Sequence, residues 1–305
     1  MSEIKKMTLA NMPEEELFYG HKACPGCGGS LAVRLVMKVL GPNTFVVVPA
    51  NCMSAVSFYY PAMNFGCNAL ASAFPCTAAT MSGIEAAARA KKIEDYSVVG
   101  FAGDGGTADI GLQALSGAID RNDRIIYVCY DNEAYMNTGV QESGLTPFGA
   151  KTTTSPAGSV EHGKLTHKKK MFEIIAAHGI PYAATASVGY PQDLINKVEK
   201  AKACKGTSFL HIMAPCPTGW STPIDTTVSV AKEAVECGLW YLAEYEGGQF
   251  KLNKEPKIFQ PVSDYLRKQG RFKHLNDDEI VEIERQRNTT WNRIREQWKL
   301  SLIHI

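Results

Sequence analysis

The sequence lacks several features that mark common classes of protein. Its 305 residues contain 32 Lys and Arg against 31 Asp and Glu, so the formal net charge is only +1. Without a basic surplus, we expect no nucleic-acid partner and no attraction to an anionic membrane surface. No apolar run reaches the length of a membrane span. The first 18 residues carry charges and a proline instead of the apolar centre of a secretory signal, and we therefore expect a cytoplasmic protein.

Short apolar runs with little alternation are typical of strands buried on both faces. The sequence has such runs at 44–49, 96–102, 124–130, 181–188 and 208–214. Helix-like segments lie among them at 30–40, 77–92, 108–120, 169–178 and 191–203. The alternation predicts an α/β fold, with a doubly wound, mostly parallel sheet and helices on both faces.

The two ends of the chain differ in composition. We expect one α/β domain over residues 1–245, followed by a C-terminal helical extension over 246–305. The extension is predicted to begin with a linker (246–261) and to end with a charged helix (277–300). Within the domain, residues 147–168 are rich in Thr, Ser, Gly, Pro and His and predict a long loop, which is often functional. The run Lys168-Lys169-Lys170 is expected to be the solvated start of a helix.

The most informative segment is 103–139, where polar residues follow two neighbouring strand-like runs. Gly103-Asp104-Gly105 follows the first run and Asp131-Asn132 follows the second. Because a strand–helix–strand unit in a parallel sheet brings both carboxyl ends together, Asp104 and Asn132 are expected to converge. A carboxylate and an amide oxygen beside glycine-rich backbone suit Mg²⁺ that carries a diphosphate. The N–H groups at the start of the next helix favour the phosphates.

Four cysteines form a second constellation. Cys24 and Cys27 make a CxxC motif, Cys52 follows the first predicted strand, and Cys216 follows the last. In a parallel sheet, Cys52 and Cys216 emerge at the edge that carries Asp104, so the thiolates should lie near the diphosphate site. The spacing alone leaves three alternatives open: an iron–sulfur cluster, a closed zinc site, or a redox pair at the CxxC. The five remaining cysteines are expected to be ordinary small apolar residues: Cys67, Cys76, Cys129, Cys204 and Cys237.

These motifs are similar to those of a known family. GDG followed by a distant Asn resembles the thiamine diphosphate motif, and the continuation from Asp131 to Gly139, DNEAYMNTG, is more particular. It resembles the beta subunit of the multi-subunit 2-oxoacid:ferredoxin oxidoreductases, especially the pyruvate enzyme. The cysteine pattern, with CxGCG early and CPTGW late, is also similar. The resemblance covers nearly the whole chain and implies the thiamine diphosphate-binding fold with an N-terminal cluster-binding segment.

The resemblance also implies roles for individual residues. It implies one thiamine diphosphate, one Mg²⁺ and one 4Fe–4S cluster. The Mg²⁺ ligands would be Asp104, Asn132 and the carbonyl of Ala134. The cluster ligands would be Cys24, Cys27, Cys52 and Cys216. Further implied contacts with the coenzyme are Gly103, Gly105, Gly106, Asn137 and Thr138, together with Cys52 and Met53 near the thiazolium. Asn137 is the candidate for a catalytic contact with the substrate, and its alternative is a turn asparagine.

The implied activity is the oxidative decarboxylation of pyruvate with coenzyme A to acetyl-CoA and CO₂, with the electrons passing to ferredoxin. Branched-chain or aryl 2-oxoacids and oxalate are alternative substrates. Since the chain has no second, pyrimidine-binding domain, we expect an alpha subunit that supplies the pyrimidine-side glutamate and a ferredoxin-like cluster subunit. Two other classes stay open here: a non-redox decarboxylase or carboligase, and a zinc-stabilised nucleotide-binding module without catalysis.

Overall fold

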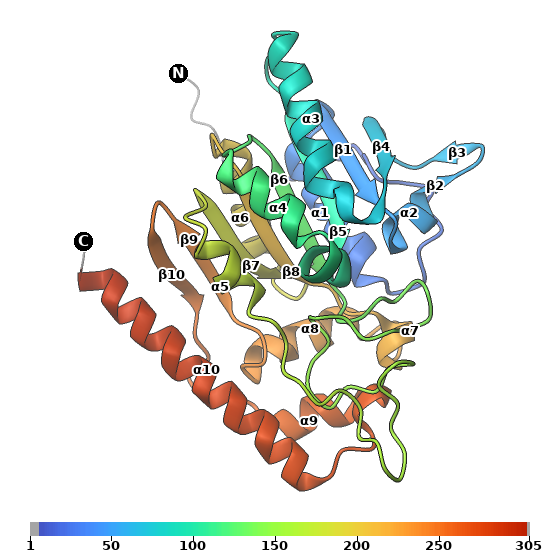
Figure 1. Ribbon diagram of the computed structural model, residues 1–305, viewed down its shortest axis with the longest axis vertical. Helices are drawn as coiled ribbons and strands as arrows, with labels where there is room; N and C mark the ends of the chain where they lie inside the picture. The colour runs from blue at the N-terminus through green and yellow to red at the C-terminus, as the bar shows by residue number, and fades with distance from the viewer. Residues whose placement is uncertain (1–5, 304–305) are drawn as a thin grey trace.

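A computed structural model describes residues 6–303 and shows an eight-stranded sheet at the centre of the molecule (Figure 1). Residues 1–5, which begin the charged N-terminal segment, and residues 304–305 lie outside the described part. The strands are β1 (Thr44–Pro49), β4 (Asn68–Ser72), β5 (Ser97–Gly103), β6 (Ile126–Asp131), β7 (Tyr182–Ser187), β8 (Ser208–Met213), β9 (Leu242–Glu246) and β10 (Gln249–Lys254). The sheet order is β10-β9-β7-β8-β6-β5-β1-β4.

The sheet is mostly parallel, as the sequence predicts. The pairs β7–β8, β8–β6, β6–β5, β5–β1 and β1–β4 are parallel. Within this eight-stranded sheet, the β9–β10 hairpin runs antiparallel, at the edge next to β7; β2 (Phe58–Tyr59) and β3 (Ala62–Met63) form a separate antiparallel pair. In β1, Val46 and Val48 enter the core on one face and Val47 enters the core on the other, so the strand is apolar on both sides.

Helices cover both faces of the sheet (Figure 1). One core cluster lies beneath α1 (Gly28–Leu40), α6 (Pro191–Ala203) and α8 (Thr227–Glu236). The other lies beneath α3 (Thr77–Ala90), α4 (Leu112–Asp120) and α5 (Met171–Ala176). The long α10 (Asp277–Ile303) runs beside β10. Shorter elements are α2 (Cys52–Ser57), β2 (Phe58–Tyr59), β3 (Ala62–Met63), η1 (Phe74–Cys76), η2 (Gly106–Ile110), α7 (Pro217–Trp220), α9 (Val262–Arg267) and η3 (Gly270–Phe272).

Three sequence predictions about these elements were wrong in detail. Residues 249–254, expected to lie in a linker, form β10. The helix expected over 108–120 begins with a π-helical turn at Gly106–Ile110 before α4 starts. The run at Lys168 is not simply solvated, because the Lys168 side chain is only 23% exposed and forms ion pairs. The division of the chain at residue 245 stays a prediction.

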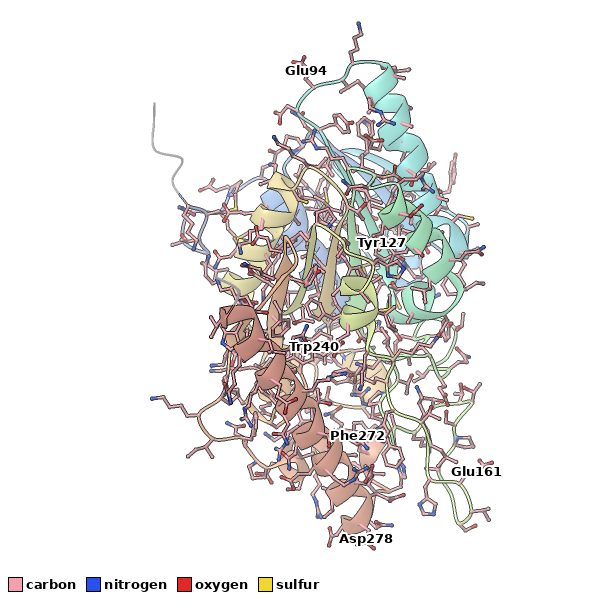
Figure 2. All side chains as sticks on the ribbon, turned by 60° about the vertical axis from the view of Figure 1, so that its left-hand side comes forward. Glu94, Tyr127, Glu161, Trp240, Phe272 and Asp278 are labelled. Atoms are coloured by element: carbon pink, nitrogen blue, oxygen red, sulfur yellow. The ribbon has the colours of Figure 1, made fainter. Side chains whose placement is uncertain are left out.

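The long loop over 147–168 is confirmed and lies at one end of the molecule. Figure 2 shows Glu161 in this loop and Asp278 at the start of α10, both at the lower end of the view. His162 Nδ1 lies 3.3 Å from Glu279 Oε1, so the loop and the helix touch there. In the described part of the chain, no helix has the length and apolar character needed to cross a bilayer.

Candidate active site

Four adjacent parallel strands deliver the candidate residues to one edge of the sheet. Across the order β8-β6-β5-β1, the loops that follow the strands carry Cys216, Asn132, Asp104 and Cys52. A cavity of about 290 Å³ opens there. Its lining includes Cys52, Gly103, Asp104, Gly105, Gly106, Asn132, Ala134, Asn137 and Thr138. The convergence expected from the strand–helix–strand spacing is therefore present.

Three oxygen-bearing groups meet in this cavity. One terminal atom of the Asn132 amide lies 3.1 Å from Asp104 Oδ1 and 3.0 Å from the carbonyl oxygen of Ala134. With nitrogen at that position, the amide donates to both oxygens; with oxygen there, three oxygens face one another. A half-turn of one side chain thus converts a hydrogen-bonded cluster into the all-oxygen donor set that Mg²⁺ prefers.

Asp104 is placed for binding a cation. It is 1% exposed, and burial together with the charge of Asp131 raises its pKa well above the usual value. Its Oδ2 accepts a hydrogen bond of 2.5 Å from Ser143 Oγ. A buried carboxylate is costly to ionise unless a positive charge compensates it. A bound cation beside Oδ1 would supply that charge.

Two glycines at the cavity allow aromatic rings to pack against the backbone. A Cβ atom at Gly105 would lie 2.2 Å from Cε1 of Tyr135, and one at Gly106 would lie 3.2 Å from Cε2 of Phe74. The Tyr135 ring is held where it is by a 2.9 Å hydrogen bond from its hydroxyl to Asp109. The aromatic rings therefore pack directly on the GDGG backbone, in space that only glycine leaves free.

Gly105→Ala should destabilise the protein by about 1–3 kcal/mol, since the added methyl group overlaps the Tyr135 ring. Urea unfolding would measure this loss. The matched control is Gly83→Ala in α3, where a Cβ meets no heavy atom within 4 Å. That substitution should instead stabilise the helix by about 0.5–1 kcal/mol. Equal unfolding free energies for the two variants would contradict the packing role of Gly105.

The thiols lie beside the oxygen cluster. Cys27 is the N-cap of α1, Cys216 is the N-cap of α7, and Cys52 opens α2. Gly28, next to Cys27, donates a 3.0 Å hydrogen bond to the Pro215 carbonyl and ties the CxxC segment to the Cys216 segment. Burial, together with smaller effects of the nearby Cys216, Cys27, Asp104 and Cys24, raises the pKa of Cys52 to about 12. The other three thiols and Asp104 therefore lie close enough to Cys52 to influence it.

In this structure the four thiols do not lie close enough together to bind one metal centre. Within residues 6–303, no three Cys, His, Asp or Glu side chains are close enough together to hold a metal ion. Cys24 is exposed, whereas Cys27, Cys52 and Cys216 are half-buried. Thiolates suit iron–sulfur clusters and zinc alike, so the chemistry of the donors fits both.

A buried ionic network supports the loop that carries Asn132 and Ala134. Lys168 Nζ lies 2.9 Å from Asp131 Oδ2 and 2.7 Å from Glu133 Oε1. His211 Nε2 lies 2.9 Å from the same Asp131 oxygen, and Arg271 pairs with Glu133 at 2.5 Å. Glu133 has a φ of 69°, in the left-handed region that residues with a Cβ rarely adopt. The network therefore fixes the residues on both sides of Asn132.

Trp220 of the CPTGW motif connects the cysteine segment to the same loop. The Trp220 indole N–H donates a 2.8 Å hydrogen bond to the Asn132 carbonyl, and the ring is fully buried. The Arg271 guanidinium stacks over this ring at 3.8 Å. Residues from 88 and 138 positions away thus hold the loop that carries Asn132 and Ala134. Nothing in the sequence alone marks Ser143, Lys168, Trp220 or Arg271 as site residues.

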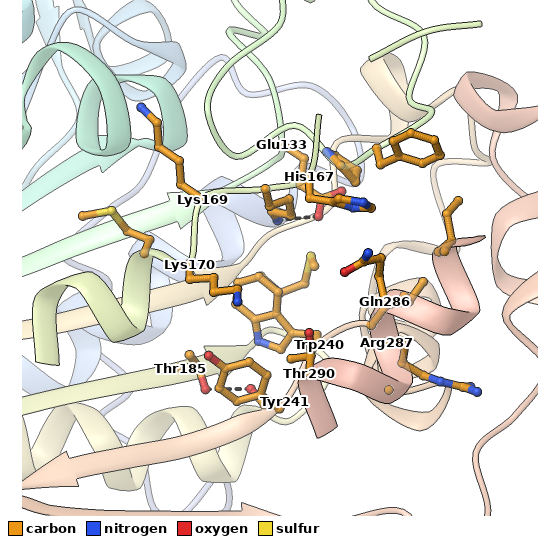
Figure 3. Close-up of a pocket in the computed structure, with 18 of the residues that line it drawn as sticks. Glu133, His167, Lys169, Lys170, Thr185, Trp240, Tyr241, Gln286, Arg287 and Thr290 are labelled. Carbon is orange, nitrogen blue, oxygen red and sulfur yellow. Dashed lines mark hydrogen bonds and ion pairs between the residues drawn. The ribbon is translucent and has the colours of Figure 1, made fainter. Parts of the chain in front are cut away.

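A second cavity, of about 210 Å³, adjoins the loop that carries Asn132 and Ala134. Glu133 lines it, whereas Asn132 and Ala134 line the first cavity, so alternate residues of the loop face different spaces. Figure 3 shows Glu133 and His167 above this space, Trp240 and Tyr241 below it, and Gln286, Arg287 and Thr290 of α10 beside it. Helix α10 therefore lines a cavity that is also lined by Glu133, the residue between the candidate Mg²⁺ ligands Asn132 and Ala134.

Three further predicted residues take different positions. Asn137 and Thr138 are exposed at the mouth of the cavity, and Thr138 pairs with Gln141 through a 2.5 Å side-chain hydrogen bond. Met53 is 1% exposed and does not line the cavity; its Cε packs near Gly29. The structure thus places Asn137 and Thr138 within reach of a bound molecule and places Met53 in the core.

Fold and site together define a thiamine diphosphate-binding α/β domain. The family model for the C-terminal TPP-binding domain of thiamine pyrophosphate enzymes matches residues 51–212. The chain is 49% identical over 274 residues to pyruvate synthase subunit PorB of Methanothermobacter thermautotrophicus, covering 90% of this chain and 95% of that one. It is 46% identical to ketoisovalerate oxidoreductase subunit VorB of Pyrococcus abyssi, with 92% and 93% covered. The chain belongs to the 2-oxoacid:ferredoxin oxidoreductase family, as a beta subunit.

A solved structure has the same fold. It is the 2-oxoglutarate:ferredoxin oxidoreductase from Magnetococcus marinus, with a TM-score of 0.55 and 19% identity, covering 76% of this chain and 82% of that chain. The family membership confirms the recognition made from the DNEAYMNTG segment and makes this chain an enzyme subunit that works with partner subunits. The non-catalytic alternative from the sequence is therefore wrong.

Proposed function

We propose that the 290 Å³ cavity binds thiamine diphosphate through Mg²⁺ held by Asp104, Asn132 and the Ala134 carbonyl. The observation that carries this proposal is the convergence of the three groups: one atom of the Asn132 amide lies 3.1 Å from Asp104 Oδ1 and 3.0 Å from the Ala134 carbonyl oxygen. Gly103, Gly105 and Gly106 bring bare backbone to the diphosphate. When bound, the coenzyme supplies the carbon chemistry that cleaves a 2-oxoacid next to its keto group. The protein holds and orients the coenzyme.

A second part of the proposal concerns the thiols. Cys24, Cys27, Cys52 and Cys216 would hold one 4Fe–4S cluster beside the coenzyme. The support is their shared position at the sheet edge and the effect of Cys216, Cys27 and Cys24 on the Cys52 pKa. A cluster accepts electrons one at a time, which suits an enzyme that passes electrons to ferredoxin. Asn137 and Thr138, at the mouth, are placed to contact the coenzyme or the substrate.

The proposed reaction consumes pyruvate and coenzyme A and forms acetyl-CoA and CO₂, and it passes two electrons singly to ferredoxin. The relative named for pyruvate synthase supports this substrate. Because relatives named for ketoisovalerate are almost as similar, a branched-chain 2-oxoacid is the second candidate. An alpha subunit would provide the pyrimidine-side glutamate, and a ferredoxin-like subunit would carry the electrons outward.

One experiment tests the whole proposal. The chain should be purified without oxygen, and its iron, acid-labile sulfide and zinc should be measured in the isolated chain, since a ferredoxin-like partner would contribute iron of its own. The chain should then be combined with its partner subunits. Reduction of ferredoxin should then be assayed with pyruvate, branched-chain and aryl 2-oxoacids and oxalate. We expect a brown protein with iron and sulfide and the highest kcat/KM for pyruvate. A colourless, zinc-loaded protein would contradict the cluster, and a higher kcat/KM for ketoisovalerate would replace pyruvate with the second candidate.

Cys216→Ser should lower cluster occupancy, because one of the four thiolates is lost. The change should appear as less iron per chain and weaker visible absorption. Cys204→Ser is a matched control, since Cys204 is also half-buried but follows α6, away from the candidate ligands. We expect the control to keep the iron content of the parent protein. An unchanged visible spectrum in Cys216→Ser would rule out Cys216 as a ligand.

A further inference from the structure

The 210 Å³ cavity beside α10 has no part in the proposed coenzyme site. None of its lining residues lines the first cavity. Its walls come from α5, β7, β8 and α10, together with the loops that precede α5 and follow α8. An apolar cavity of about 150 Å³ is large enough to bind benzene. The cavity beside α10 therefore has room for an aromatic ring with a short side chain.

Aromatic side chains form two walls of this cavity. On one side, Phe148 stacks on His167, with ring centroids 5.0 Å apart. On the other side, the indole N–H of Trp240 donates a 2.9 Å hydrogen bond to the Ala186 carbonyl, which holds the ring in place. Figure 3 shows His167 above the space and Trp240 below it. Because these rings are already held, a planar aromatic body can pack between them at little cost in side-chain entropy.

The charged groups around the cavity favour an anion. Six Lys and Arg side chains line it, against two carboxylates, Glu133 and Glu173. Five of the six cations have a carboxylate partner, whereas Lys170 has none among the described residues. Arg271 is 5% exposed and donates through Nε to Gln269 and through Nη2 to Glu133, so its Nη1 has no acceptor within residues 6–303. The cavity thus offers one uncompensated positive charge and one buried group with free donors.

We propose that this cavity is a second ligand site, separate from the coenzyme cavity, and that it binds a small aromatic monocarboxylate. The ring packs between Trp240 and His167. The carboxylate accepts a hydrogen bond from Arg271 Nη1 and is attracted by the Lys170 ammonium. A phosphate ester fits less well, because it carries more negative charge and Glu133 in the same cavity repels it. The site depends neither on the coenzyme nor on the iron–sulfur cluster.

The test uses phenylacetate as the probe and the tryptophan fluorescence of the full chain as the signal, because Trp240 lines the cavity. Thr290, on α10, also lines it. Thr290→Phe should lower the affinity for phenylacetate at least about tenfold, since the new ring overlaps the space that the ligand needs. Thr289→Phe is the matched control, because Thr289 is exposed on the same helix and is not a lining residue. The control should keep the parent affinity. No fluorescence change in the parent, or parent-like affinity in Thr290→Phe, would overturn the site.

A charge variant provides a second test. The parent should bind phenylacetate about two- to fivefold more tightly than uncharged benzyl alcohol, the range for an exposed ion pair. Lys170→Met should remove this preference and leave the affinity for benzyl alcohol unchanged. Equal binding of the two probes to the parent would overturn the choice of an anion. Saturating thiamine diphosphate with Mg²⁺ should leave phenylacetate bound, and displacement of the probe would overturn the second site by showing that the probe binds in the first cavity.

Discussion

Asp104→Asn should weaken the binding of thiamine diphosphate with Mg²⁺ by at least about 100-fold, because even residues behind a metal ligand alter affinity by 10–100-fold. The substitution keeps the shape of the side chain but removes the charge. It also leaves an acceptor for Ser143, which now bonds to Asp104 Oδ2 at 2.5 Å. Since burial raises the pKa of Asp104 and favours its neutral form, the ligand-free variant should unfold at nearly the same urea concentration as the parent.

Calorimetric titration with thiamine diphosphate in the presence of Mg²⁺ measures this affinity, and iron analysis of the same sample provides an internal check. The iron content should stay near that of the parent protein, because Asp104 is not a proposed cluster ligand. Asp120→Asn, on the exposed end of α4, is a suitable control and should bind normally. Parent-like affinity in Asp104→Asn would refute the Mg²⁺ assignment. Equal loss of iron and coenzyme would argue against two separate sites.

The central residues of this site were predictable from the sequence because they depend on short-range order. Asp104 and Asn132 each follow a buried strand, and the two strands are consecutive along the chain and adjacent in the sheet. Strand pairing of this kind follows from apolar runs and from the handedness of the connection. Cys52 and Cys216 reach the same edge of the sheet because each also follows a parallel strand, although β1 and β8 are far apart in sequence.

The ion pairs that hold the site in place could not be predicted in the same way. Lys168 lies in a run of three lysines, and composition favours a solvated surface for such a run. Its partner Asp131 is buried at the end of β6, and only the path of the long loop brings the two together. Arg271 comes from the C-terminal extension to pair with Glu133. Strands β4, β9 and β10 were not predicted. Of these, β4 and β10 lie at the sheet edges; β4 has only one large apolar residue, and β10 alternates polar residues with Phe250 and Leu252.

Lys168→Met should have the largest effect on stability. Two buried carboxylates, Asp131 and Glu133, would lose the ammonium that lies within 2.9 Å of both. Breaking a buried ion pair by removing one partner typically costs about 3–5 kcal/mol, and urea unfolding should show a loss of this size. Lys170→Met, two residues away at an exposed position, should change the free energy of unfolding by no more than about 0.5 kcal/mol.

The pH dependence of the same variant distinguishes lost charge from lost packing. Burial alone would raise the pKa of Asp131, but Lys168 and His211 hold it at about 2, below the ordinary 3.8. A carboxyl whose pKa is lowered by folding stabilises the protein above the unfolded-state pKa, and this stability is lost as the pH falls through the folded-state value. The parent should therefore lose stability between about pH 4 and pH 2 through Asp131. In Lys168→Met that loss should shrink, because only His211 remains to hold the carboxylate. If the loss of stability at acid pH were the same in Lys168→Met as in the parent, Lys168 would support the loop that carries Asn132 by packing alone.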